Sequence, residues 1–414
     1  MMKRLLLVSL LAIGGLTDIR ASLDNRYLFP LNQHLFMRSL KKQSDAWVRG
    51  FFMTASQARD ENGCNLTLPM LSGTYDLAAI NSAMNSIGLT NPWYLSEWGA
   101  SEIPFGAFGK LRSSGVALAL EYQLLPHCSL GAAFSLMHAS ARSDYCVTQK
   151  TREAMKLVYG DEWYPGRERA LEQARLGVNK TLGLCSGRWS ATGVSDLDFY
   201  VRLGGIEEYL WKLRQVDASV TLGAIAPTGK KRNVYDPASF PFDGNGLWGA
   251  FIKGDLSLEL TDDWYFGLWL YTSKRFSKTQ ISRMPMAREP LPYGVLVDNA
   301  RINPGITLAA SPYLVLDDLY DGFGVYAQYA YIHHTHDFWQ YSGRCKPNLS
   351  RLNCAGYWTN EFLSFGLDYD FTKRTIPAEY GPRFFMDCIV PVQLFNAQWV
   401  AKTYQVSLGV EFNF

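Results

Sequence analysis

Three neighbouring histidines have the residue type and spacing that could bind a metal ion. His334 and His336 share one face of a predicted strand, and His333 and Asp337 flank them in the sequence. Neutral imidazole and carboxylate groups are common ligands of divalent transition metals. The cluster falls at the outer end of the strand, where solvated side chains are the simpler interpretation. We therefore predict no metal site and no cofactor.

A histidine and a serine could together support ester hydrolysis. His138 and Ser140 lie two residues apart, on one face of another predicted strand. A hydrolase would need the histidine to activate the serine hydroxyl and a third polar group to orient the histidine. No hydrolase motif surrounds the pair. We predict that the protein is not an enzyme, and a hydrolase on a lipid-facing or luminal wall is the minor alternative.

The composition limits the kind of scaffold that positions these residues. The 414 residues are 48% hydrophobic and 14% aromatic, with 40 Lys+Arg against 38 Asp+Glu and a formal charge of +2. A near-neutral chain offers no basic surface for nucleic acid. No run of about 18 or more apolar residues follows the first two dozen residues. What remains is an aromatic-rich soluble β protein or a transmembrane β-barrel, whose alternating strands average to a neutral hydropathy.

The N-terminus predicts export. Lys3 and Arg4 precede an apolar core that ends at Leu16, and the small residue Ala21 follows. This is the order of regions in a secretory signal peptide, which we predict over 1–21. A buried helix or a membrane anchor is the alternative, but the apolar core is short for a spanning anchor.

Export would make the seven cysteines candidates for disulfides, although an odd number leaves one unpaired. Cys345 and Cys354 are close together in a polar stretch, whereas Cys146 and Cys185 bracket a charged segment. Each pair could close a loop, so both pairings are hypotheses. The sequence has no CxxC motif and no Cys/His spacing of the zinc type, which argues against metal binding by cysteine.

The end of the chain has the clearest strand pattern. Over 404–414 apolar residues stand at every even position and polar or small residues stand between them. A soluble edge strand could alternate in the same way. However, an apolar final strand that ends on Phe414 resembles the C-terminal signature of Gram-negative outer-membrane barrels. We predict that Phe412 and Phe414 form an assembly signal for the barrel-assembly machinery.

The same period of two recurs upstream and predicts about 12 strands, within a range of about 10 to 14. Three of them are less regular than the others, and 103–112 could add another strand. The strands are predicted at 47–56, 113–124, 128–140, 194–204, 213–225, 247–260, 264–274, 301–312, 321–334, 358–371, 382–394 and 402–414.

The lengths of the connections favour a barrel over a sandwich of two sheets. Short connections alternate with long polar ones along the chain, and only the last outer loop, 395–401, is short. Transmembrane barrels have short periplasmic turns and long external loops, whereas a sandwich has no reason to alternate. Trp264 and Trp269 fall toward opposite ends of one strand, where aromatic girdles belong. We predict an all-β fold, a transmembrane antiparallel β-barrel over 47–414.

Three segments are predicted to lie outside the plain wall of the barrel. Residues 57–112 are too long for a simple loop and could form a constriction or plug. The polar segment within 141–192 reads as a partly helical external loop. Residues 22–46 are predicted to be a periplasmic lead-in.

One stretch resembles a known family. Thr221-Leu222-Gly223, then Pro227-Thr228-Gly229-Lys230, then Asp243-Gly244-Asn245-Gly246 resembles the strand–loop–strand unit of the phenol-degradation outer-membrane family, a relative of the long-chain fatty-acid transporters. The resemblance covers about forty residues. It implies a passive channel for small hydrophobic solutes. The chain departs from the fatty-acid transporters because their N-terminal hatch motif is absent and the insertion at 150–184 is foreign to them.

The polar faces of the predicted strands define a candidate lumen. Charges of both signs would project inward, and in a narrow barrel they would pair across it rather than select ions strongly. An alternative is that they only hydrate or plug the lumen. The predicted pore-lining residues are Asp198, Arg202, Asp217, Lys253, Asp255, Glu259 and Glu411.

The sequence therefore predicts a channel of the Gram-negative outer membrane for passive diffusion of small solutes through a partly occluded lumen. Its expected partners are outer-membrane lipid, the assembly machinery and an unidentified small solute, with no nucleic acid. The alternative is a non-conducting barrel that acts as an adhesin or structural protein through its external loops.

Overall fold

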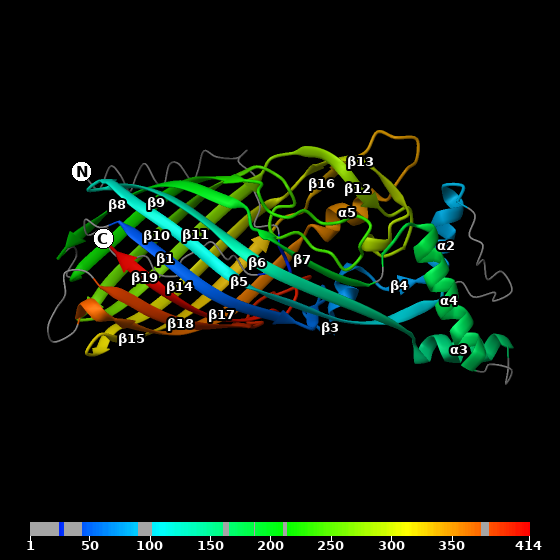
Figure 1. Cartoon of the computed structure of the whole chain (residues 1–414), viewed down its shortest axis with the longest axis horizontal. Helices are drawn as coiled ribbons and strands as arrows, with labels where there is room; N and C mark the ends of the chain where they lie inside the picture. Colours follow the sequence, from blue (N-terminus) through cyan, green and yellow to red (C-terminus); the bar gives the residue numbers. More distant parts are fainter. Residues whose placement is uncertain are drawn as a thin grey trace.

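A computed structural model of the chain contains a closed antiparallel β-barrel (Figure 1). The structure describes residues 25–28, 44–89, 102–159, 165–185, 187–209, 213–373 and 381–414. Of the 14 strands in the main sheet, β4 (Tyr75–Asp76) is a short edge strand and β7 continues the line of β8, which leaves 12 wall positions. The wall strands are β1 (Asp45–Ala55), β5 (Pro104–Leu125), β6 (Cys128–Val147), β7 (Arg188–Val194) with β8 (Leu197–Glu208), β9 (Gln215–Ala226), β10 (Gly249–Thr261), β11 (Trp264–Arg275), β14 (Ile306–Tyr320), β15 (Phe323–His334), β17 (Trp358–Asp370), β18 (Pro382–Pro391) and β19 (Tyr404–Asn413).

The barrel closes because β1 pairs with both β19 and β5, and β5 in turn pairs with β6. No wall strand is left with an unpaired edge, which removes the usual liability of an open sheet. Along most of the wall buried residues alternate with more exposed ones, as in β19, where Gln405 and Ser407 are buried and Val406 and Leu408 are exposed. The buried side chains face inward and the exposed apolar side chains face outward. This is the pattern of a barrel with lipid outside.

Each of the twelve predicted strands has a counterpart in the wall, and the fold prediction is confirmed. Two boundaries were wrong. The strand predicted at 301–312 is β14, which begins only at Ile306, because Leu296–Asn303 forms β13 of a separate sheet. The possible extra strand at 103–112 is the first half of β5, which runs unbroken from Pro104 to Leu125.

The two ends of the barrel differ. We call the end with the turn at 262–263 and the C-terminus the turn end, and the opposite end the loop end (Figure 1). The loop end carries α2 (Leu77–Ser86), α3 (Gln149–Tyr159), α4 (Pro165–Thr181) and α5 (Leu349–Ala355). It also carries a three-stranded sheet and a small hairpin. Their strands are β12 (Lys278–Met284), β13 (Leu296–Asn303) and β16 (Phe338–Gln340), then β2 (Gln57–Arg59) and β3 (Asn65–Thr67).

The helices of the loop end form where capping and apolar spacing allow. Asp76 caps α2, because its carboxylate accepts hydrogen bonds from the backbone N–H groups of Ala78 and Ala79. Leu171 of α4 and Met155 of α3 pack in one buried cluster with α2. The predicted helical loop is therefore present, but its limits were wrong, since Val147 ends β6 and Arg188 begins β7. No helix in the described ranges is long and apolar enough to cross a membrane.

Part of the segment predicted as a plug packs inside the loop end. Leu68 and Leu71, in the short 3-10 helix η1 (Leu68–Ser72), belong to the same buried cluster as Met53 and Leu111 of the inward wall. Short 3-10 helices also occur at η5 (Leu291–Tyr293) and η6 (Phe371–Lys373).

Four residues near the N-terminus lie at the loop end. The Asn25 side chain donates to the carbonyl of Pro241 over 2.7 Å, and Arg26 donates to the carbonyl of Ala355 over 3.2 Å. Thr403 donates to the carbonyl of Tyr27 over 2.6 Å. These contacts depart from the periplasmic position expected for 22–46, while Ser44 bonds to Phe414 at the turn end. The predicted signal peptide lies outside the described residues.

Candidate solute pathway and outer pocket

All seven predicted pore-lining residues stand at inward positions of their strands. Arg202, Asp217, Lys253, Asp255 and Glu411 are buried, whereas Asp198 and Glu259 are partly exposed. Their placement agrees with the predicted lumen, and their role in conduction stays a prediction.

The charges on β5 and β8 to β10 pair along the wall. Arg202 forms an ion pair with Glu121 over 3.4 Å and donates to the Ser219 hydroxyl over 3.2 Å. The Nζ of Lys253 lies 5.8 Å from the centre of the Trp269 ring, a cation–π contact. The contacts to Ser219 and Trp269 join neighbouring strands, and the Arg202–Glu121 ion pair reaches across β6 from β8 to β5.

A second charged group lies on β14, β17 and β18, near the turn end. Arg383 donates to Asp368 over 2.8 Å and lies 4.0 Å from Asp317, which also pairs with Lys373. The predicted pore-lining residues do not include this group, apart from Glu411 opposite Arg383 on the next strand. The alternation of β18 is weak, because its inward positions include an apolar residue, Phe385, beside the charged ones.

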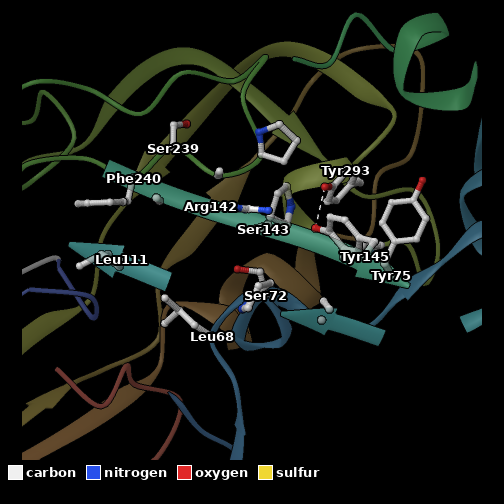
Figure 2. Close-up of a pocket in the computed structure, with 18 of the residues that line it drawn as sticks. Leu68, Ser72, Tyr75, Leu111, Arg142, Ser143, Tyr145, Ser239, Phe240 and Tyr293 are labelled. Carbon is white, nitrogen blue, oxygen red and sulfur yellow. Dashed lines mark hydrogen bonds between the residues drawn. The ribbon is translucent and has the colours of Figure 1, made fainter. Parts of the chain in front are cut away.

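A pocket opens at the loop end, between the extensions of β5 and β6 and two external loops (Figure 2). It measures about 600 Å³ when the solvent at its mouth is included. Its lining is mostly aromatic and proline side chains with a few hydroxyls. The residues that define its character are Tyr75, Tyr145, Tyr293, Pro69, Pro292 and Phe240.

Three tyrosines from distant segments form one wall of this outer pocket. The hydroxyl of Tyr293 donates to that of Tyr145 over 2.7 Å, and the ring centres of Tyr75 and Tyr293 are 4.8 Å apart at an interplanar angle of 88°. Arg175 of α4 lies over Tyr145, 4.9 Å from the ring centre, and pairs with Glu172. Burial raises the pKa of Tyr75 and of Tyr293, so both phenols stay neutral.

No sequence signal pointed to the outer pocket. Its tyrosines are far apart in the sequence, since 148 residues separate even Tyr145 from Tyr293, and Tyr75 lies further upstream. A single aromatic residue in a predicted loop is uninformative until the fold brings its partners together. The nearest available signal was the Pro-rich run around Pro290 and Pro292, which predicts a rigid loop but not its neighbours.

The residues that carry the family resemblance build a loop around one buried carboxylate. Asp196, in the break between β7 and β8, accepts hydrogen bonds from the backbone N–H of Gly229 over 2.8 Å and of Gly244 over 3.1 Å. It also pairs with Arg275 over 2.5 Å. A Cβ at Gly244 would lie 2.2 Å from the Arg275 guanidinium carbon, so a larger residue there would displace Arg275 from Asp196. In this chain the motif fixes the loop between β9 and β10 onto the wall.

The histidine cluster is engaged in protein contacts. His334 is buried, its Nδ1 lies 2.8 Å from the Thr307 hydroxyl and its Nε2 lies 3.1 Å from Asp337. His336 stacks on Tyr357 at 4.8 Å. Within the described ranges no group of three or more His, Cys, Asp or Glu residues could hold a metal ion.

The cysteines and the His138–Ser140 pair are the remaining candidates from the sequence. All seven cysteines are free, so neither the Cys146–Cys185 pair nor the Cys345–Cys354 pair forms a disulfide, and that prediction is not supported. His138 Nδ1 lies 2.9 Å from the Thr192 hydroxyl on the outward face. Among the hydrogen bonds of the described part, none joins His138 to Ser140.

Comparison with solved structures agrees with this architecture. The fold is similar to that of an outer membrane channel from Pseudomonas putida F1, with a TM-score of 0.50 and 12% sequence identity over 94% of this chain and 98% of that one. Lower similarity is found to the β domain of the Bordetella autotransporter BrkA (TM-score 0.38, 12% identity, 90% of this chain, 100% of that one). A Pseudomonas aeruginosa FadL homologue gives a TM-score of 0.33 at 11% identity, covering 90% of each chain. No family model and no curated protein matches the sequence. The protein has the fold of an outer-membrane β-barrel.

Proposed function

We propose that the protein is a channel of the Gram-negative outer membrane for passive diffusion of small solutes, with the outer pocket as its entrance. The observation that carries the proposal is the position of this pocket, at the loop end of a closed barrel whose inward face is polar and charged. A polar interior is typical of barrels that hold water. Similarity in fold to the Pseudomonas putida channel supports the same class of function.

The lining of the outer pocket suits a small, uncharged and partly apolar solute. The partly exposed ring of Tyr145, packed against the buried rings of Tyr75 and Tyr293, offers a π surface, and Pro69 and Pro292 offer flat apolar surfaces. The Tyr145 hydroxyl, which accepts a hydrogen bond from Tyr293, still has its own O–H to donate to a hydroxyl of the solute. This agrees with the hydrophobic solutes that the sequence resemblance implies.

Transport across reconstituted membranes tests the proposal. Purified protein in planar bilayers should give conductance steps, and in liposomes it should admit small hydroxylated aromatic compounds. The Ala238→Trp variant adds bulk to the pocket lining and should slow uptake at least severalfold, whereas the matched Ala218→Trp variant adds the same bulk on the exposed outward face of β9 and should not.

The competing function is a non-conducting barrel that displays its loops. The absence of both conductance and uptake would favour it. The same result should then hold for a variant without residues 25–28, which removes the segment bonded inside the loop end. Heat-modifiable migration on gels and a requirement for detergent would test membrane insertion separately from conduction.

Assembly by the barrel-assembly machinery is part of the same proposal. Phe412 and Phe414 are both exposed, and the backbone of Phe414 pairs with Ser44 over 2.9 and 3.0 Å. Deleting Phe414 should lower the amount of inserted protein in cells. Normal insertion of that variant would remove the support for a terminal assembly signal.

A further inference from the structure

The outward face of β5, β6 and β7 changes character in four steps toward the loop end. Strand register aligns these residues in rows across the three strands, because each row joins directly opposite positions. The rows, in order, are Val116–Leu136–Val194, Ser114–His138–Thr192, Arg112–Ser140–Ser190 and Lys110–Arg142–Arg188. Successive rows are two residues apart, about 7 Å along the strand.

The last row is a ladder of three cations. Lys110 is opposite Arg142, and Arg142 is opposite Arg188. Like charges directly opposite each other on neighbouring strands destabilise a sheet. All three side chains are exposed, as is Arg112 one row below. Such a row carries a cost to the fold that an anionic ligand would offset.

Little in the protein balances this charge. On the outward face of β5 to β7 the single carboxylate is Asp144, which pairs with Arg142 over 2.5 Å. Lys110, Arg112 and Arg188 have no hydrogen bond or ion pair with any residue that the structure describes. The outward face of β17 differs, since the charge of Glu361 there is covered by the backbone N–H groups of 394–396.

We propose that this face, the cationic ladder with Arg112, binds a phosphorylated glycolipid of the outer leaflet. The proposal rests on the membrane location put forward above and not on conduction. The apolar row receives acyl chains, the row of hydroxyl and imidazole groups meets the sugar, and the guanidinium groups bind phosphate. Val116 and Leu136, at 38% and 48% exposure, place the apolar surface directly below the polar rows.

The depth of the cations favours a glycolipid over an ordinary phospholipid. Arg112 and Lys110 lie four and six residues beyond Val116, or about 13 and 20 Å along the tilted strand. A single phosphate on a glycerol backbone reaches one of these rows. A large sugar headgroup with anionic groups at more than one depth reaches both.

Lipid binding to the purified protein tests the proposal. The protein, stripped of native lipid in detergent, is placed in phosphatidylcholine nanodiscs with increasing amounts of diphosphorylated lipid A, and bound lipid is counted by native mass spectrometry. The parent should retain lipid A. The K110Q/R142Q/R188Q variant should bind about a hundredfold more weakly, since each basic residue near a membrane surface contributes about fivefold.

Controls separate this binding from general electrostatics and from misfolding. The K180Q/R301Q/R344Q variant removes three exposed cations elsewhere at the loop end and should bind as the parent does. Both variants should keep heat-modifiable migration and the parent's conductance. If the triple variant fails to fold, lipid A binding is measured instead for the single variants R112Q and R188Q.

Three results would overturn the proposal. They are equal binding of lipid A by parent and triple variant, equal binding of dephosphorylated lipid A by the parent, and equally tight binding of phosphatidylglycerol. A parent that needs no detergent and does not insert would instead overturn the membrane location, and with it the proposed function.

Discussion

Two buried arginines at opposite ends of the barrel are held in different ways. Arg383, near the turn end, donates to the Asp368 carboxylate over 2.8 Å on the neighbouring strand β17. Arg283, in β12 at the loop end, donates to three backbone carbonyls, of Val234 and Gly294 over 2.8 Å and of Leu182 over 3.2 Å. Burial lowers the pKa of Arg283 to about 10, and the interaction with Tyr235 offsets only part of this loss of water.

The difference shows how each end is stabilised. At the turn end, the Arg383–Asp368 ion pair joins two strands that the sheet already joins, so it acts on the wall itself. At the loop end, one guanidinium group connects the end of α4, the loop between β9 and β10, and the segment after η5. These segments have no sheet in common, and Arg283 holds them together through its planar fork of donors.

Removing Arg383 should have the largest effect. Arg383→Met leaves the buried carboxylate of Asp368 without its cation, which in comparable buried pairs costs about 3–5 kcal/mol. We expect the free energy of unfolding of the barrel in urea to fall by that amount. The double variant Arg383→Met/Asp368→Leu should regain most of it, since both charges are then gone. A loss below about 1 kcal/mol for the single variant would show that water in the lumen already solvates Asp368.

Asp196 combines both kinds of stabilisation, because it pairs with an arginine of the wall and also holds a loop. Asp196→Ala should cost about 2–4 kcal/mol by leaving Arg275 without this carboxylate and two glycine N–H groups without an acceptor. Unlike Arg383→Met, it should also expose the loop between β9 and β10 to protease. Asp196→Asn, which keeps an acceptor, is the control and should fall between parent and alanine variant. An unchanged cleavage rate in Asp196→Ala would contradict the role given to this loop.

The wall could be predicted from the sequence because its signal is local. In β19 and β9, apolar outward residues alternate with polar inward ones, and the period of two is enough to place each strand. The signal weakens where the inward face is also apolar, as at Phe385 and Ile389 of β18. It misleads at 301–303, because an external strand and a wall strand share the same alternation.

The loop end could not be predicted in the same way, because its contacts join residues far apart in the sequence. Arg283 and Leu182 are 101 residues apart. The role of Gly229 and Gly244 depends on Asp196, whose carboxylate accepts their backbone N–H groups. Turn chemistry in the sequence identified these glycines as loop residues. It could not identify the carboxylate they surround or the pocket formed beside them.

Removing Arg283 should affect the loop end alone. Arg283→Met breaks three hydrogen bonds from a charged donor, but water can replace some of them at the three carbonyls, so we expect a local loss of about 1–3 kcal/mol. Limited proteolysis at the loop end should accelerate, while the urea transition of the barrel shifts by less than about 0.5 kcal/mol. The exposed Arg301→Met variant is the control for removing a charge from the same sheet. A shift of the whole transition would show that the two ends unfold together.

The smallest expected effect concerns the carboxyl of Asp243, which accepts a hydrogen bond from the backbone N–H of Asp196 over 2.9 Å. Burial, together with the neighbouring Asp196 carboxylate, raises the pKa of Asp243 well above its usual range. The folded loop therefore favours the protonated form, and its contribution to stability is complete below the unfolded pKa of about 4 and is lost as the pH rises through the folded value.

Hydrogen exchange of the amides of 229–246 should be faster in the parent at high pH, after correction for intrinsic rates. Asp243→Asn keeps an acceptor without a titrating charge and should flatten this dependence. If the corrected exchange of the parent does not change with pH, Arg275 already balances the charge of both carboxylates. The site would then be stabilised by ion pairs, as Arg383 is at the turn end.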